Sequence, residues 1–104
     1  MVLKSVQKLL AMEYKKKEHA SSSLPSSEVH LRHLTVDEAL LKLDKYLNDA
    51  FMAGLCQVKV IHGKGTGTLR EATHKALAKH PLVKSYRLGD YGEGGAGVTV
   101  VELV

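Results

Sequence analysis

The segment VIHGKGTGTLREA, residues 60–72, decides how the rest of the chain is interpreted. It leaves a hydrophobic run, passes three glycines, and enters a stretch with helical spacing of apolar residues. Glycines let a backbone adopt conformations closed to other residues and approach a ligand closely. The first turn of a helix adds unpaired N–H groups and a partial positive charge. Two interpretations follow: a plain strand-to-helix turn, or a binding site for an anion such as phosphate.

The residue types in this segment favour phosphate as the anion, if one binds. Lys64 and Arg70 bring full positive charges, and arginine can hold a phosphate through two hydrogen bonds. The order of residues is neither that of a P-loop, GxxxxGK[ST], nor that of the dinucleotide motif GxGxxG. The candidate phosphate-binding residues are Gly63, Lys64, Gly65, Thr66, Gly67, Thr68 and Arg70.

Outward from this segment, the chain alternates strand-like and helix-like patterns. Thr35 and Glu38 form a capping box that begins a helix, whose apolar stripe runs to a stop at Gly54. A second capping box, Thr68 with Glu71, is expected to begin another helix, which Pro81 ends. Strands are expected on either side of these helices, at residues 28–33, 55–62, 82–88 and 98–104.

This order, β-α-β-α-β-β, predicts a single small α/β (α+β) domain with a four-stranded mixed sheet and two helices. Helical crossovers join the early strands, which favours parallel pairing there. The last two strands are expected to form a hairpin across the glycine-rich residues 89–97.

Composition limits the class of protein. The 104 residues suffice for one domain, residues 28–104, preceded by a basic segment and serine-rich linker, residues 1–27. Residues 1–27 carry five lysines against two glutamates, a net +3, whereas residues 28–104 carry ten basic and nine acidic residues, a net +1. Any anion site in the domain must therefore be local.

The single cysteine fits a reducing compartment. The sequence has no 18-residue apolar run and no secretory signal, so we expect a cytoplasmic protein and no membrane partner.

The basic segment has two interpretations. Residues 1–18 have the spacing of a short amphipathic helix, and three consecutive lysines follow Tyr14. The segment is either a solvated arm left from a longer parent protein or a tether to nucleic acid or the ribosome.

Three motifs together resemble the Smr (small MutS-related) domain. HGKGTGTLR, residues 62–70, is similar to its signature loop, HLTVDEALLKLDKYLNDAFMAG to its first helix, and GEGGAGVTVVEL to its closing turn and strand. HPLVKSYRLG is similar to the segment between them, so the resemblance covers residues 29–103. These motif sequences are most similar to those of Smr domains at the C-terminus of bacterial MutS-type proteins of the recombination-suppressing branch.

The resemblance implies a fold like the C-terminal domain of translation initiation factor three, a mixed sheet with two helices on one face. It implies binding of branched or structured DNA or RNA, nicking endonuclease activity in several members, and for this branch a role at collided ribosomes. The isolated domain is expected to be a monomer.

The first strand departs from the family motif L-D-L-[HR]-G. Here His30 occupies the usual Asp position and His33 the usual Gly position. Histidine can transfer protons at neutral pH but is a poor magnesium ligand, so a mechanism that needs the Asp is not supported. We expect no cofactor, with magnesium the one weak candidate. The candidate catalytic residues are His30, Arg32 and His62, with Arg32 polarising phosphate and a histidine moving the proton.

The other histidines carry less weight. No pair has the i, i+4 spacing of a helical zinc site, so we expect no metal centre. His62 is either an acid–base catalyst or a brace that hydrogen-bonds the loop backbone, while His74 is expected to be an ordinary helix-surface residue.

Tyr86 and Tyr91 could stack on bases. Two hypotheses remain, a nicking endonuclease and a binding module without cleavage.

Overall fold

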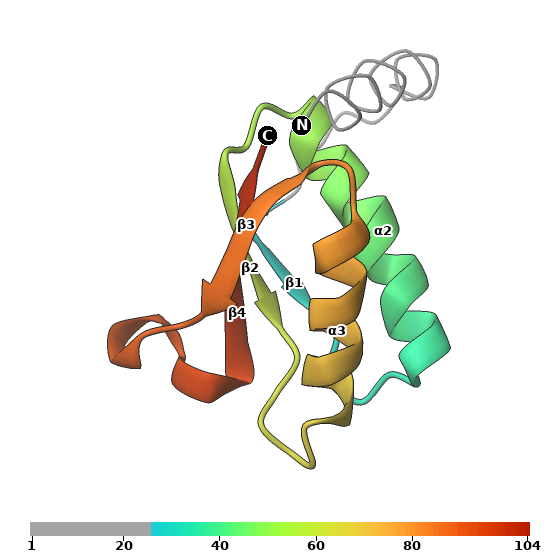
Figure 1. Cartoon of the computed structure of the whole chain (residues 1–104), viewed down its shortest axis with the longest axis vertical. Coiled ribbons are helices and arrows are strands. Elements are labelled where there is room, and N and C mark those ends of the chain that lie inside the picture. Colours follow the sequence, from blue (N-terminus) through green and yellow to red (C-terminus); the bar gives the residue numbers. More distant parts are fainter. Residues whose placement is uncertain (1–25) are drawn as a thin grey trace.

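A computed structural model describes residues 26–104, so the amphipathic helix expected at residues 1–18 lies outside the described part. Figure 1 shows two helices packed on one face of a four-stranded sheet. The elements, with two 3-10 helices labelled η, are β1 (Glu28–His30), α2 (Val36–Met52), β2 (Gln57–Ile61), α3 (Thr68–Lys79), β3 (Val83–Leu88), η1 (Tyr91–Glu93), η2 (Gly95–Gly97) and β4 (Val98–Leu103). The predicted fold class and element order are confirmed.

The sheet has the order β1-β2-β4-β3. β1 pairs in parallel with β2, and β4 pairs antiparallel with both β2 and β3, so the parallel pair and the hairpin are both confirmed. Parallel pairing does not extend to β2 and β3, because β4 lies between them. The reason is that β4 buries five of its six residues and so belongs in the centre of the sheet.

The core lies between the sheet and the helices. α2 buries one stripe, Ala39, Leu43, Leu47 and Ala50, against valines of β2 and β4. Among the described residues, no helix has the length and apolarity to cross a bilayer.

The ends of α2 form as the sequence predicts. The Thr35 hydroxyl accepts from the Glu38 N–H at 3.2 Å, and the Glu38 carboxylate accepts from the Thr35 N–H at 3.0 Å. At the other end Gly54, with φ of 83°, donates to the carbonyl of Phe51 while Leu55 donates to that of Ala50. This Schellman pattern turns the chain directly into β2.

The capping box predicted for α3 is wrong. The N-cap residue is Gly67, and Thr68 is already the first helical residue. The Thr68 hydroxyl lies 2.9 Å from that of Thr66 instead of reaching along the helix. The N-cap residue Gly67 provides no side-chain cap, and the N–H of Thr68 makes one long hydrogen bond of 3.4 Å to the hydroxyl of Thr66, so the start of α3 faces the loop without a capping box.

Candidate nucleic-acid interface

The glycine loop, residues 63–67, connects β2 to α3 at the lower end of Figure 1. Gly63, Gly65 and Gly67 have φ of 83°, 31° and 88°, in the left-handed region that favours glycine. A Cβ at Gly67 would lie 2.8 Å from the guanidinium of Arg70, and one at Gly63 would lie 3.3 Å from Cγ of Arg32. The glycines thus both bend the loop and let two arginines approach its backbone.

A pocket of about 260 Å³ opens at this loop, which we call the glycine-loop pocket. It is lined by residues 62–70 and by Arg32 and His33, which follow β1. Arg32, Lys64 and Arg70 supply three positive charges, and none of the lining residues is acidic. The uncapped N-terminus of α3 adds its partial positive charge to the same space.

Most of the site residues predicted from the sequence line the pocket, but one does not. Arg32, His62 and all the candidate phosphate-binding residues line the glycine-loop pocket. His30 does not: it lies on β1 with its side chain exposed, 3.9 Å from the carboxylate of Glu28. Its backbone carbonyl accepts a hydrogen bond from Lys42 at 2.9 Å. His30 is therefore not among the residues that line the glycine-loop pocket.

His33 has a backbone conformation that explains the glycine of the resembled motif. Its φ is 71°, and among the described residues it is the one non-glycine residue with a positive φ. A side chain in this region is strained, at roughly 1–2 kcal/mol. The turn that brings Arg32 to the pocket requires the left-handed conformation, which glycine adopts without strain.

His62 is buried behind the glycine loop in a chain of hydrogen bonds. Its Nδ1 lies 2.9 Å from the carbonyl oxygen of Gly63, and its Nε2 lies 2.8 Å from the hydroxyl of Thr99 on β4. The same hydroxyl lies 2.8 Å from Nε2 of His74 on α3. Three elements of the fold thus meet at one hydroxyl group.

The carbonyl end of this chain determines where the protons lie. A carbonyl oxygen only accepts, so Nδ1 of His62 carries the proton, and in the neutral ring Nε2 is then an acceptor. Thr99 must donate its proton to that Nε2. The Thr99 oxygen in turn accepts from His74, which carries its proton on Nε2.

Both histidines are held in the neutral form. Burial lowers the pKa of His62 below its ordinary value of 6.5; the hydrogen bond to Gly63 opposes this effect, and the charge of Arg70 adds to it. Burial also lowers the pKa of His74, with further contributions from His62 and Arg70. At neutral pH His62 therefore braces the loop as an uncharged ring.

The glycine-rich residues 89–97, which we call the closing turn, support the same loop from the other side. The carbonyl of Gly97 accepts from the N–H groups of His62 at 3.1 Å and of Gly63 at 2.9 Å. A Cβ at Gly97 would lie 3.4 Å from Cγ of Lys64, so the two glycine-rich segments are in contact.

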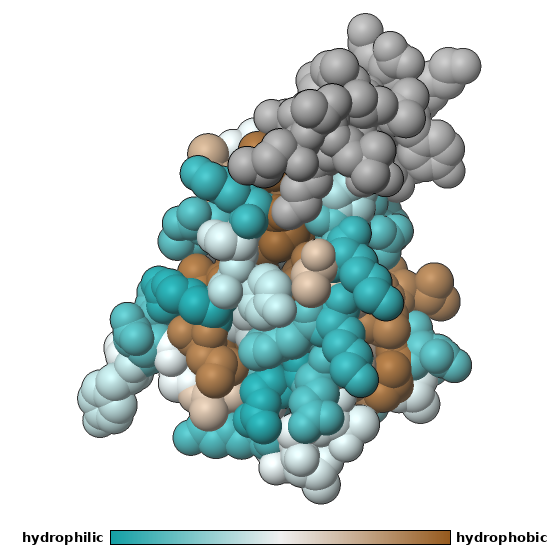
Figure 2. Space-filling view, viewed as in Figure 1, coloured by the Kyte–Doolittle hydropathy of each residue, from teal (hydrophilic) through white to brown (hydrophobic). Residues whose placement is uncertain are grey.

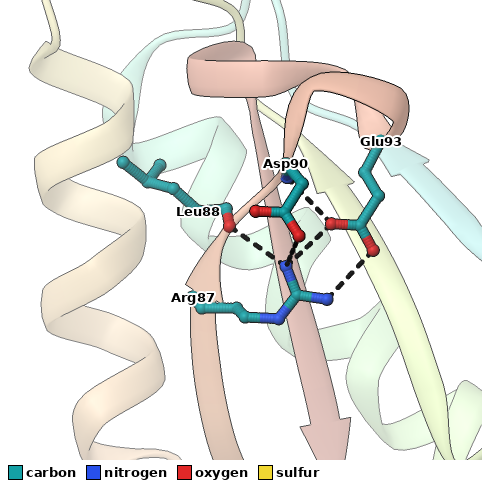
Figure 3. A network of polar contacts seen from close by, with 4 residues as sticks. All are labelled: Arg87, Leu88, Asp90 and Glu93. Carbon is teal, nitrogen blue, oxygen red and sulfur yellow. Dashed lines mark hydrogen bonds and ion pairs between the residues drawn. The ribbon is translucent and has the colours of Figure 1, made fainter.

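An ion pair holds the closing turn in shape (Figure 3). The guanidinium of Arg87 donates to both carboxylate oxygens of Glu93, at 2.7 and 2.9 Å, and lies 3.8 Å from Asp90. Glu93 also accepts from the N–H of Asp90 at 2.8 Å. The hydrogen bonds from Arg87 and Asp90 lower the pKa of Glu93 to about 2.

Sequence reasoning missed two residues of this site. His74 was expected to be an ordinary helix-surface residue, and Thr99 was counted only as part of a strand. The available signal was the hydroxyl residue inside VTVVELV, because a polar side chain in an otherwise apolar central strand needs a buried partner. No group of three metal-binding side chains occurs among residues 26–104.

The fold, the cationic glycine loop and its position between a strand and an uncapped helix define a small MutS-related module. The Smr domain family matches residues 29–104, and the chain belongs to this family. Two relatives named Endonuclease MutS2 are similar, one of Pelotomaculum thermopropionicum, 63% identical over 75% of this chain, and one of Clostridium novyi, 57% identical over 86%. The matched regions are 10% and 12% of those relatives, so the chain spans about a tenth of their length.

Solved structures show the same fold. The crystal structure of the Smr domain of Thermus thermophilus MutS2 is 51% identical, with a TM-score of 0.73, covering 74% of this chain and 96% of that one. The structure of YdaL, a stand-alone small MutS-related protein from Escherichia coli, is 25% identical, with a TM-score of 0.69, covering 85% and 72%.

Proposed function

We propose that this domain binds DNA or RNA by holding a backbone phosphate in the glycine-loop pocket. The observation that carries the proposal is the convergence of Arg32, Lys64 and Arg70 on a pocket without acidic lining residues, at the N-terminus of an uncapped helix. Backbone N–H groups, a helix N-terminus and arginine side chains are the groups that bind phosphate in proteins. The match to the Smr family and the relatives named as endonucleases support nucleic acid as the source of the phosphate.

The charge distribution supports binding at one local site rather than across a broad basic surface. The domain has a net charge of only +1, so the three pocket cations stand out against a near-neutral background. In Figure 2, hydrophilic side chains cover most of the face that carries α3, and brown hydrophobic groups lie to either side. Contacts to phosphate position a nucleic acid without reading its sequence, so the domain should respond to the shape of its ligand.

Nicking of a phosphodiester is the second candidate function, and the names of the relatives favour it. The pocket cations would stabilise the negative charge that develops on phosphorus oxygens during hydrolysis. The proton-transfer residue is less well placed: both ring nitrogens of His62 are engaged within the protein, and His30 lies outside the pocket. This geometry supports a binding function more strongly than a catalytic one.

For the biological setting, we propose docking on branched DNA, in suppression of homologous recombination, or on the RNA of collided ribosomes. The resemblance to the recombination-suppressing MutS-type proteins supports both settings. Affinities of the domain for a four-way DNA junction and for a ribosomal RNA hairpin, measured at one salt concentration, distinguish them.

Reversal of the pocket charges tests the binding function. We expect Lys64→Glu with Arg70→Glu to weaken binding of a labelled DNA junction by at least tenfold in fluorescence anisotropy. The slope of log affinity against log salt should fall by about one for each phosphate that the variant no longer neutralises. The matched control is Lys75→Glu with Lys79→Glu, which makes the same charge change on exposed residues of α3 that do not line the pocket. Equal losses of affinity in the two double variants would contradict a specific site.

A cleavage assay separates the two candidates. The domain is incubated with supercoiled plasmid and with structured RNA, with and without a chelator. Nicking that disappears in the Lys64→Glu, Arg70→Glu variant would establish the endonuclease at this pocket. Binding without nicking of either substrate would leave the binding module as the function.

A further inference from the structure

Tyr91 is an aromatic side chain that the glycine-loop pocket does not use. It lies at the start of η1 in the closing turn and is fully exposed, with 102% of its reference area open to solvent. The other exposed large hydrophobic residues among residues 26–104, Leu41, Leu88 and Tyr86, are all less exposed. The ring adds nothing to the core and is accessible to a ligand.

The turn that carries Tyr91 is rigidly built. Arg87 and the N–H of Asp90 both bond to Glu93, which closes the three residues that contain Tyr91 into one capped turn (Figure 3). The N–H of Gly95, which follows Tyr91 in the chain, donates to the carbonyl of Asp90, which precedes it, at 3.0 Å. A turn whose backbone is already fixed loses little conformational entropy when its side chain binds a ligand.

The same turn is attached to the proposed phosphate site. Its last residue, Gly97, accepts hydrogen bonds from His62 and Gly63 at the entrance of the glycine loop. Tyr91 and Gly97 are six positions apart in the sequence, so their Cα atoms lie within roughly 22 Å of each other. About six nucleotides of a duplex-like strand cover that distance. One nucleic-acid strand can therefore occupy both places.

We propose that Tyr91 stacks on an unpaired base of the nucleic acid whose phosphate lies in the glycine-loop pocket. The inference rests on the proposed binding function and adds to it a preference for unpaired nucleotides. An exposed tyrosine offers a flat face that every base can stack on, whereas the bases of an intact duplex are already stacked on each other. Arg87 pairs with the carboxylate of Glu93, so among these three residues Asp90 leaves one unbalanced negative charge next to Tyr91.

The absence of tryptophan from the sequence allows a direct test. The Tyr91→Trp variant of the full chain contains a single tryptophan, whose fluorescence is quenched when a base stacks on it. We expect an oligothymidylate of about 12 nucleotides to quench this fluorescence with the same midpoint as its binding measured by anisotropy. A blunt DNA duplex should bind with little quenching.

Two further variants give the energetic side of the test. Tyr91→Ala should weaken oligothymidylate binding about tenfold and leave duplex binding unchanged, while Tyr91→Phe should bind like the original chain. Since the side chain is exposed, none of these substitutions should alter the unfolding transition.

The outcomes distinguish the two proposals. If the original chain binds no nucleic acid, or if Lys64→Glu with Arg70→Glu has no more effect than its control, the glycine-loop site fails and the stacking site fails with it. If that pair of variants behaves as expected but Tyr91→Trp is not quenched and Tyr91→Ala binds normally, only the stacking proposal is overturned.

Discussion

The rings of His62 and His74 stand edge to face with their centroids 6.0 Å apart, joined through the hydroxyl of Thr99. One comes from the end of β2 and the other from α3, the two elements that the glycine loop connects. Because Nδ1 of the neutral His62 ring donates to the carbonyl of Gly63, the hydroxyl can bond to both rings only when His74 is protonated on Nε2. The position of the loop is thus tied to one arrangement of protons behind it.

Removal of the Thr99 hydroxyl should cost more than removal of its methyl group. Thr99→Val keeps the shape but leaves a nitrogen of each histidine without its partner, at about 1–3 kcal/mol of unfolding free energy. Thr99→Ser keeps the hydroxyl and should lower the unfolding free energy by about 1 kcal/mol through the missing methyl. Urea unfolding measures both, and nitrogen NMR of the imidazoles reads the tautomers. Unchanged tautomers in the valine variant would contradict the hydrogen-bond chain.

Substitutions at His62 should separate a brace from a catalyst. His62→Asn can still donate to the carbonyl of Gly63, so a brace predicts binding near that of the original chain. His62→Ala removes the bond and leaves a cavity, and should lower the unfolding free energy by about 2–4 kcal/mol and weaken binding. If the domain nicks and both variants bind normally but cleave at least about a hundredfold more slowly, His62 is the catalyst instead.

Stability should fall as the pH drops below about 6.5. The pKa of His62 and that of His74 are lowered in the folded protein, so the unfolded chain binds more protons in this range. The stability that the neutral rings contribute is complete above the unfolded pKa and is lost as the pH falls toward the folded values, by at most about 1.4 kcal/mol per pH unit for each ring.

Urea unfolding from pH 8 to pH 5 measures this effect. The carboxylate of Glu93 titrates in a separate window, between its ordinary 4.5 and about 2, so it does not interfere. His62→Asn is the control and should make the profile less steep between pH 6.5 and 5, with the contribution of His74 remaining. A profile as steep as the original would assign the effect to other groups.

The basic segment should contribute affinity without selectivity. Deletion of residues 1–27 removes +3 of the net charge of +4, so binding should weaken and its salt dependence should decrease. The order of affinities for a junction, a hairpin and a single strand should stay the same, because the domain provides the shaped surface. Competition anisotropy at fixed salt measures this order of affinities. Loss of the order on deletion would show that residues 1–27, and not the domain, distinguish the shapes.

Replacement of His33 by glycine should stabilise the fold. The gain from relieving the left-handed backbone exceeds the entropy that glycine loses on folding, which leaves a net of roughly 0.5–1 kcal/mol. His33→Ala retains the strain and serves as the control. Equal stability of the two variants in thermal unfolding would show that this turn carries no strain.

Local patterns explain what the sequence could predict. The Thr35–Glu38 box and the glycine at position 54 act within a few residues of themselves, and the structure matches them. Thr68 has the same local pattern, but its helix begins at a left-handed glycine, so the box does not form. The bond between His74 and Thr99 joins residues 25 positions apart, and no local pattern contains it. The central place of β4 likewise depended on burial on both faces, which only the assembled sheet shows.

The place of β4 in the sheet also affects how the domain can form during synthesis. A nascent chain that has reached residue 97 contains both helices and three strands, yet β2 and β3 still lack the strand that joins them. Nor has it the hydroxyl that His62 and His74 share. The sheet can therefore be completed only after β4 has been synthesised. A chain that stops before residue 98 would have neither a complete sheet nor the hydroxyl behind the glycine loop.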